Sequence, residues 1–179
     1  MKRNILLFAS TAIIAIALFT TTANAQYEAG KSYLGPSIGF AFLGSTPDFG
    51  VSYEYGINMP NFGMVGIGGL FRYWGYSESY FYGSWKYTDI LIGVQGNYHF
   101  VTNTKFDPYI GLVLAYDAGS VAWSGPEGYN YASPTYGGMW LAAQGGARYW
   151  VSPTVAITGR IGFGTLGYSG LDFGVDFKF

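Results

Sequence analysis

Strict alternation of apolar with small or polar residues is the feature of this sequence that most constrains its fold. The last nine residues, LDFGVDFKF (171–179), place Leu, Phe and Val at every second position, with Asp, Gly and Lys between them. A period of two is the pattern of a β-strand, because successive side chains point to opposite faces of a sheet. Such a strand has one apolar and one polar face, and its fold depends on which of them faces the interior.

The same alternation recurs in eight segments, which are separated by clusters of Gly, Pro, Asn, Asp and Ser. Shorter turns alternate with longer loops between them, as in outer-membrane barrels. An even number of strands lets the first pair with the last, which removes the sheet edges. We therefore predict an all-β fold, an eight-stranded antiparallel up-and-down transmembrane β-barrel. The predicted strands are 32–43, 49–57, 64–76, 87–100, 109–122, 139–151, 154–165 and 171–179.

The distribution of charged residues indicates that the apolar faces point outward to lipid. The chain is 11% charged and 50% hydrophobic, whereas a soluble domain carries about 25% charged residues. Each charged residue within a predicted strand falls on the polar face. The others, including Asp48 and Asp107, are assigned to loops, turns or the segment before the first strand. A charge facing lipid at mid-bilayer costs about 2–4 kcal/mol, so this distribution favours a membrane barrel over a soluble sandwich.

The polar faces therefore line the inside of the predicted barrel. An eight-stranded barrel has room for side chains and little else, and buried charges must be paired and hydrogen-bonded. We expect an ion-pair network that plugs the lumen, with inward glycines leaving room for the arginines; Arg148 and Arg160 are candidate partners for the acids of the last strand. The expected members are Glu54, Arg72, Asp89, His99, Asp117, Arg148, Arg160, Asp172, Asp176 and Lys178.

Aromatic residues gather near the ends of the predicted strands and in the connections between them. Tyr and Trp near strand ends suit the membrane interface. Another group is expected in loops. These residues either pack within the loops and at the membrane interface, or form a contact surface for an extracellular protein or other surface ligand. The candidate contact residues are Tyr80, Phe81, Tyr82, Trp85, Tyr129, Tyr131 and Tyr136.

The first 25 residues have the pattern of an export signal. Lys2 and Arg3 precede an apolar run of about 15 residues, and the segment ends in TTTANA. This order is typical of a cleaved signal peptide, and cleavage is expected after Ala25. The apolar run is shorter than the roughly 20 residues that a spanning helix needs. Residues 26–179 are expected to form the barrel domain.

The sequence predicts no catalytic, cofactor or metal site. His99 is the single histidine and the chain has no cysteine, which disfavours a transition-metal site. Val101 stands two residues after His99, so the His-x-Ser pattern of outer-membrane lipid A deacylases is missing. The glycine clusters at 66–69 and 162–164 lie within predicted strands rather than before a helix, which disfavours phosphate binding. A net charge of -1 gives no reason to expect a nucleic-acid partner.

Two stretches, GNYHFVTNTKFDPYIGLVLAYDAG (96–119) and GGARYWVSPTVAITGRIGFG (145–164), resemble the superfamily of small outer-membrane β-barrels. This superfamily includes OmpA-like, OmpX-like, OmpW-like and opacity-type proteins. FDPYIGLVLAY resembles its F-x-P-Y-x-G-x-G-x-x-Y strand start, with Val113 and Leu114 replacing the usual glycine region. LDFGVDFKF, with Phe177 and Phe179, resembles the C-terminal assembly signal that the barrel-insertion machinery recognises.

The resemblance implies a location in the outer membrane of a Gram-negative bacterium, with outer-membrane lipids and lipopolysaccharide as neighbours. Function is less constrained, because this fold hosts adhesins, channels, enzymes and plain membrane proteins. Our main hypothesis is a non-enzymatic barrel with a plugged lumen, which contributes to envelope structure and to surface interactions. The alternatives are a narrow channel or conduit for small molecules, including hydrophobic ones, and a membrane-embedded enzyme acting on lipid or peptide. The charged lumen favours the first.

Overall fold

A computed structural model describes residues 26–41, 46–100, 104–125, 134–165 and 169–179. The predicted signal peptide, its cleavage site after Ala25, and the aromatic residues Tyr129 and Tyr131 lie outside these residues. Within the described residues, no helix is long and apolar enough to cross a membrane. The strands are β1 (Ser32–Ala41), β2 (Thr46–Met59), β3 (Gly63–Tyr80), β4 (Gly83–His99), β5 (Phe106–Ser124), β6 (Thr135–Trp150), β7 (Val155–Gly164) and β8 (Ser169–Lys178).

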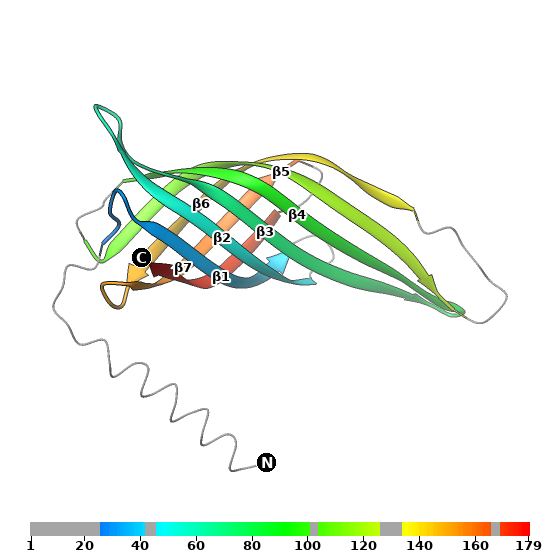
Figure 1. Cartoon of the computed structure of the whole chain (residues 1–179). Coiled ribbons are helices and arrows are strands. Elements are labelled where there is room, and N and C mark those ends of the chain that lie inside the picture. The colour runs from blue at the N-terminus through cyan, green and yellow to red at the C-terminus, as the bar shows by residue number, and fades with distance from the viewer. Residues whose placement is uncertain (1–25, 42–45, 101–103, 126–133, 166–168) are drawn as a thin grey trace, which may run out of the picture.

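The strands form a closed barrel in which each pairs with the next in antiparallel orientation and β1 pairs with β8 (Figure 1). At the seam, the backbone N–H of Phe179 donates to the carbonyl of Ser32 at 3.0 Å, and the N–H of Ser32 donates back. The final phenylalanine thus closes the ring. The predicted all-β, eight-stranded antiparallel fold is confirmed.

The two ends of the barrel differ. The described chain begins and ends at the same end, together with the β2–β3 and β6–β7 turns; we call this the terminus end. At the opposite end, the β3–β4 hairpin projects well beyond the ends of β1 and β2 (Figure 1). We call this the hairpin end. Backbone pairing of β2 with β3 stops at Asp48 and Trp74, so β3 continues for six more residues, about 20 Å, to Tyr80.

The apolar faces point outward and the polar faces point into the lumen, as the alternation predicts. Leu112 on the outer wall is 64% exposed, whereas Glu54 on the inner wall is 1% exposed. The register is constant along each pair of neighbouring strands, so no inserted residue within the paired stretches reverses the facing along a strand. The outer surface is therefore a continuous apolar band.

Strands β3 to β6 run further at the hairpin end than the sequence predicts. The segment SESYFYGSW, which its Ser and Gly content marks as a loop, instead forms the ends of two strands joined by a turn at Phe81 and Tyr82. Tyr76 and Tyr87 lie directly opposite each other and their rings stack, with centroids 4.5 Å apart. Aromatic cross-strand pairs stabilise a hairpin, which explains why pairing continues through this polar segment.

Candidate functional site

The lumen near the terminus end holds a cluster of buried charges centred on Arg148. Its Nη1 donates to Oε1 of Glu54 at 3.1 Å and lies 3.6 Å from Oδ2 of Asp107. Its Nε donates to Asp176. All four side chains are almost completely buried. One guanidinium therefore contacts carboxylates from three strands, β2, β5 and β8, and links these strands across the lumen.

His99 lies between two of these carboxylates. Its Nδ1 is 2.7 Å from Oδ1 of Asp107, and its Nε2 is 3.1 Å from Oε1 of Glu54. The ring of Tyr27 stacks on the imidazole, with centroids 3.6 Å apart. Both ring nitrogens are thus engaged, and the residue is 2% exposed.

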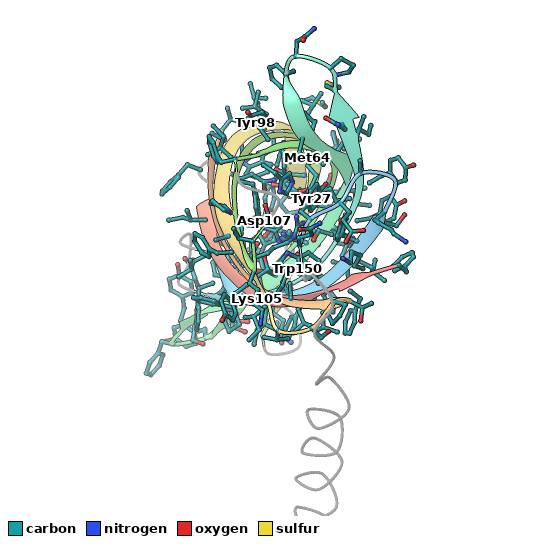
Figure 2. All side chains as sticks on the ribbon, turned by 90° about the vertical axis from the view of Figure 1, so that its left-hand side faces the viewer. Tyr27, Met64, Tyr98, Lys105, Asp107 and Trp150 are labelled. Atoms are coloured by element: carbon teal, nitrogen blue, oxygen red, sulfur yellow. The ribbon has the colours of Figure 1, made fainter. Side chains whose placement is uncertain are left out.

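Residues that precede β1 fold into the barrel and cover its terminus end. Tyr27 is 1% exposed and packs between His99 and Tyr33. Nζ of Lys178 donates to Oε1 of Glu28 at 2.8 Å and to the carbonyl oxygen of Gln26 at 3.1 Å. Viewed from this end, Tyr27 and Asp107 lie inside the ring of strands (Figure 2). The segment before β1 therefore plugs the lumen at the terminus end.

A chain of amides extends this cluster along the lumen. Asn97 donates to Glu54, and Nε2 of Gln144 donates to Oδ1 of Asn97 at 2.7 Å. The same Gln144 nitrogen also donates to Oε1 of Gln95 at 3.0 Å. These contacts join β2, β4 and β6, so the network spans the cross-section of the barrel.

A second charge cluster connects β3, β7 and β8. Oδ2 of Asp172 accepts from Nη2 of Arg72 at 2.9 Å and from Nε of Arg160 at 3.0 Å. Asp48, which is completely buried, lies beside Asp172. Arg160 and Asp172 are direct cross-strand partners, whereas Arg72 reaches them across the lumen.

The predicted interior network is present, with two corrections to its membership. Asp48 and Asp107, which we assigned to the connections between strands, lie in β2 and β5 and are fully buried. The adjacent prolines misled that assignment, because proline also fits the first residues of a strand. The sequence did contain a signal for both. Asp48 is an even number of residues from Glu54, and Asp107 from Asp117, so each falls on the same face of its strand as a predicted lumen residue. Conversely, Asp89 and Asp117 lie inside the barrel but form no ion pair within the described residues.

The lumen also contains an apolar layer that the polar-face prediction did not emphasise. A cavity bordered by Leu70, Arg72 and Leu91 has a volume of about 20 Å³, which is room for about one water molecule. The buried apolar cluster consists of Ala41, Leu70, Trp74, Leu91, Val113, Ala115, Trp140 and Ala142. Side chains thus fill this part of the barrel.

Inward glycines provide the space for these charged side chains. A Cβ atom on Gly50 would overlap the guanidinium of Arg72, whereas a Cβ atom on Gly96, which faces outward, would have no atom within 4 Å. We expect Gly50→Val to lower the free energy of unfolding by about 1–3 kcal/mol, because overpacking displaces Arg72 from Asp172. Gly96→Val is the matched control and should unfold like the wild type in urea titrations of the refolded protein. Equal midpoints for the two variants would contradict this packing.

The hairpin end carries most of the aromatic residues that the sequence analysis singled out. Phe81 and Tyr82 form the turn and are 93% and 71% exposed. Contrary to the loop assignment, Tyr80, Trp85 and Tyr136 lie in strands β3, β4 and β6. The loop assignment failed because Gly and Ser next to these residues were taken as turn signals, whereas here they occupy strand positions.

On the lumen-facing side of the projecting hairpins, aromatic rings contact one another and an acid. The rings of Trp85 and Trp123 are 5.0 Å apart. The hydroxyls of Tyr80 and Tyr87 both donate to Oε2 of Glu78, at 3.3 and 3.4 Å. The face is therefore both aromatic and acidic.

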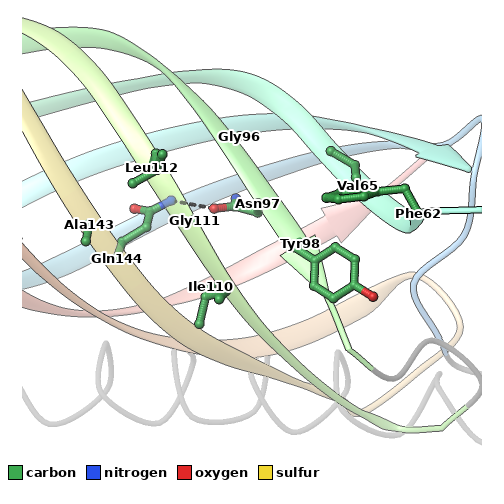
Figure 3. Close-up of a pocket in the computed structure, with 10 residues that line it drawn as sticks. All are labelled: Phe62, Val65, Gly96, Asn97, Tyr98, Ile110, Gly111, Leu112, Ala143 and Gln144. Carbon is green, nitrogen blue, oxygen red and sulfur yellow. Dashed lines mark hydrogen bonds between the residues drawn. The ribbon is translucent and has the colours of Figure 1, made fainter. Parts of the chain in front are cut away.

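The outer wall holds an apolar groove of about 590 Å³ near the terminus end (Figure 3). It forms where Gly96 leaves a gap between larger outward side chains. Asn97 and Gln144, which also border it, belong to the lumen network. Its lining residues are Phe62, Val65, Gly96, Asn97, Tyr98, Ile110, Gly111, Leu112, Ala143 and Gln144.

Comparisons with known proteins agree with this architecture. No protein-family model matches the sequence, and a search of curated proteins finds no match. Among solved structures, the N-terminal β-barrel domain of OprF from Pseudomonas aeruginosa is 15% identical, with a TM-score of 0.59 over 84% of this chain and 98% of that one.

The attachment invasion locus protein Ail of Yersinia pestis is similar to the same extent. It is 15% identical, with a TM-score of 0.58 over 85% of this chain and 100% of Ail. Its complex with the heparin analogue sucrose octasulfate gives 18% identity and a TM-score of 0.56 over the same shares. The chain therefore has the fold of small, OmpA-like eight-stranded outer-membrane β-barrels.

Proposed function

We propose that this protein is a non-enzymatic integral outer-membrane barrel with a blocked lumen, which contributes to envelope structure and makes surface contacts through its hairpin end. One observation carries the proposal: the barrel is apolar outside and is crossed inside by buried ion pairs. This arrangement is inverted relative to a soluble protein, and only a lipid environment stabilises such an exterior.

In this proposal the apolar band lies in lipid and the terminus end faces the periplasm. Acyl chains of outer-membrane lipids fill the groove beside Gly96, near the terminus end. Lipopolysaccharide surrounds the half of the apolar band that lies nearer the hairpin end. Residues 1–25 are removed after Ala25 during export. The barrel-insertion machinery recognises Phe177 and Phe179 in the closing strand during assembly.

The contents of the lumen support a blocked barrel rather than a channel or a conduit for hydrophobic molecules. Two charge clusters bridge opposite walls, Tyr27 covers the terminus end, and the cavity beside Arg72 has the volume of about one water molecule. A hydrophobic molecule would have to separate Arg148 from its three carboxylates in order to pass. Breaking buried pairs of this kind costs several kcal/mol.

The surroundings of His99 support a structural rather than a catalytic role. A general base needs an accessible nitrogen that can reach the substrate, whereas both nitrogens of His99 face carboxylates inside the barrel. The enzyme hypothesis therefore has no support from its single histidine.

The hairpin end is the proposed contact surface. Exposed aromatic residues such as Phe81 are typical anchors of protein contacts. The Ail complex contains a polyanion, sucrose octasulfate. The lumen-facing side of the hairpins here carries Glu78 and Asp89 instead. Lys86 lies on the opposite face, because it is three residues from Asp89 on β4 and side chains alternate along a strand. We therefore propose that this side does not bind a polyanion.

Cell fractionation combined with gel mobility tests the proposed location. The protein should sediment with the outer membrane and should migrate differently before and after boiling, because a folded barrel resists detergent. Recovery in the soluble periplasm, or identical mobility in both samples, would refute the proposal.

A further inference from the structure

Two buried carboxylates, those of Asp89 and Asp117, lie without a cation on the lumen-facing side of β4 and β5, where these strands begin to project toward the hairpin end. They are 3% and 7% exposed. Asp89 pairs with Gly119 and Asp117 with Leu91, so the two acids are diagonal neighbours on the same face, about 7–8 Å apart. Within the described residues neither forms an ion pair, and Oδ1 of Asp117 has no hydrogen-bond partner. These two acids therefore lack the positively charged partner that buried charges normally have.

Aromatic side chains lead from these acids toward the hairpin tip. On β4, Tyr87 stands two residues from Asp89, on the same face, and its ring stacks on that of Tyr76. The hydroxyl of Tyr136 lies within hydrogen-bonding reach of Asp89. Aromatic rings of this kind attract cations through their faces.

A third acid lies at the other end of this aromatic path. Glu78 pairs with Trp85, which is four residues from Asp89, or about 13 Å along the strand. The lumen-facing side of these strands therefore has acidic residues at both ends and aromatic residues between them.

We propose that this face binds a linear polyamine, with one ammonium group at Asp89 and Asp117, the alkyl chain along Tyr76 and Tyr87, and a second ammonium group near Glu78. Charge complementarity and the unpartnered oxygen of Asp117 carry the inference. A compact metal ion fits less well, because no group of three or more potential ligands occurs among the described residues. The inference deepens the proposed surface function and rests on its placement of the hairpins outside the cell.

Calorimetric titration of the refolded barrel in neutral detergent with spermidine tests the proposal, with Trp85 and Trp123 fluorescence as a second readout. Saturable binding is expected. Asp117→Asn and Asp89→Asn should each weaken it about tenfold or more, because each removes a charge-assisted hydrogen bond. Lys86→Gln, on the opposite face, is the matched control and should bind as the wild type does. Heat-modifiable gel mobility verifies that each variant is folded.

Three results would overturn the inference: no saturable binding by the folded wild type, binding by both Asp variants with the affinity of the wild type, or saturation by Mg²⁺ or Ca²⁺ that excludes spermidine. The last would assign the acids to a metal ion. Since the assay uses purified protein, its failure is distinct from failure of the proposed location, which fractionation tests.

Discussion

Replacing Arg148 with alanine should lower the free energy of unfolding by about 3–5 kcal/mol. The guanidinium contacts Glu54, Asp107 and Asp176, and its removal leaves three buried carboxylates without their shared cation. Urea titration of the refolded protein in lipid vesicles, followed by gel mobility and circular dichroism, measures the loss.

Lys86→Ala is the control for Arg148→Ala. It removes a cation from an exposed position of β4, where a charge contributes about 0–1 kcal/mol. A similarly small loss in Arg148→Ala would show that water fills the lumen and screens its charges, and the buried network would then not stabilise the fold.

Leu112→Arg should destabilise the barrel by about 2–4 kcal/mol. Leu112 is on the outer wall of β5 and is 64% exposed, so the arginine would face the hydrocarbon of the bilayer. The same unfolding titration in lipid vesicles measures this cost.

Phe81→Arg is the matched control for Leu112→Arg, because Phe81 is also exposed but lies at the hairpin tip, where the proposal places water. It should leave the unfolding midpoint unchanged. If the two variants unfolded alike, the apolar band would not be in contact with lipid.

The periodicity of the sequence was sufficient to predict the fold, because a period of two specifies both the strands and their facing. The direct cross-strand pair of Arg160 and Asp172 lies on two such faces, and the sequence analysis named these residues as candidate partners. Contacts across the lumen, such as that of Arg148 with Asp176, depend on barrel closure and on side-chain reach, so the sequence could give candidates for them but not the pairs.

Other parts of the site could not be predicted from the sequence, because no periodic pattern marks them. Tyr27 precedes β1, and nothing in its neighbours indicates that it folds back onto His99. The prolines beside Asp48 and Asp107 and the Gly and Ser residues around Trp85 suggested turns, whereas strand pairing overrides such local preferences. Asp89 and Asp117 were correctly placed in the lumen, but their lack of a cationic partner emerges only in three dimensions.

Planar-bilayer recording of the refolded wild-type protein tests the central claim, the blocked lumen, most directly. A general porin inserted into the same bilayers is the positive control. Because ion pairs and Tyr27 close the cross-section, the protein should insert without producing steady ion-conducting steps. Steady, reproducible steps from the wild-type protein would contradict the account and would instead support a channel.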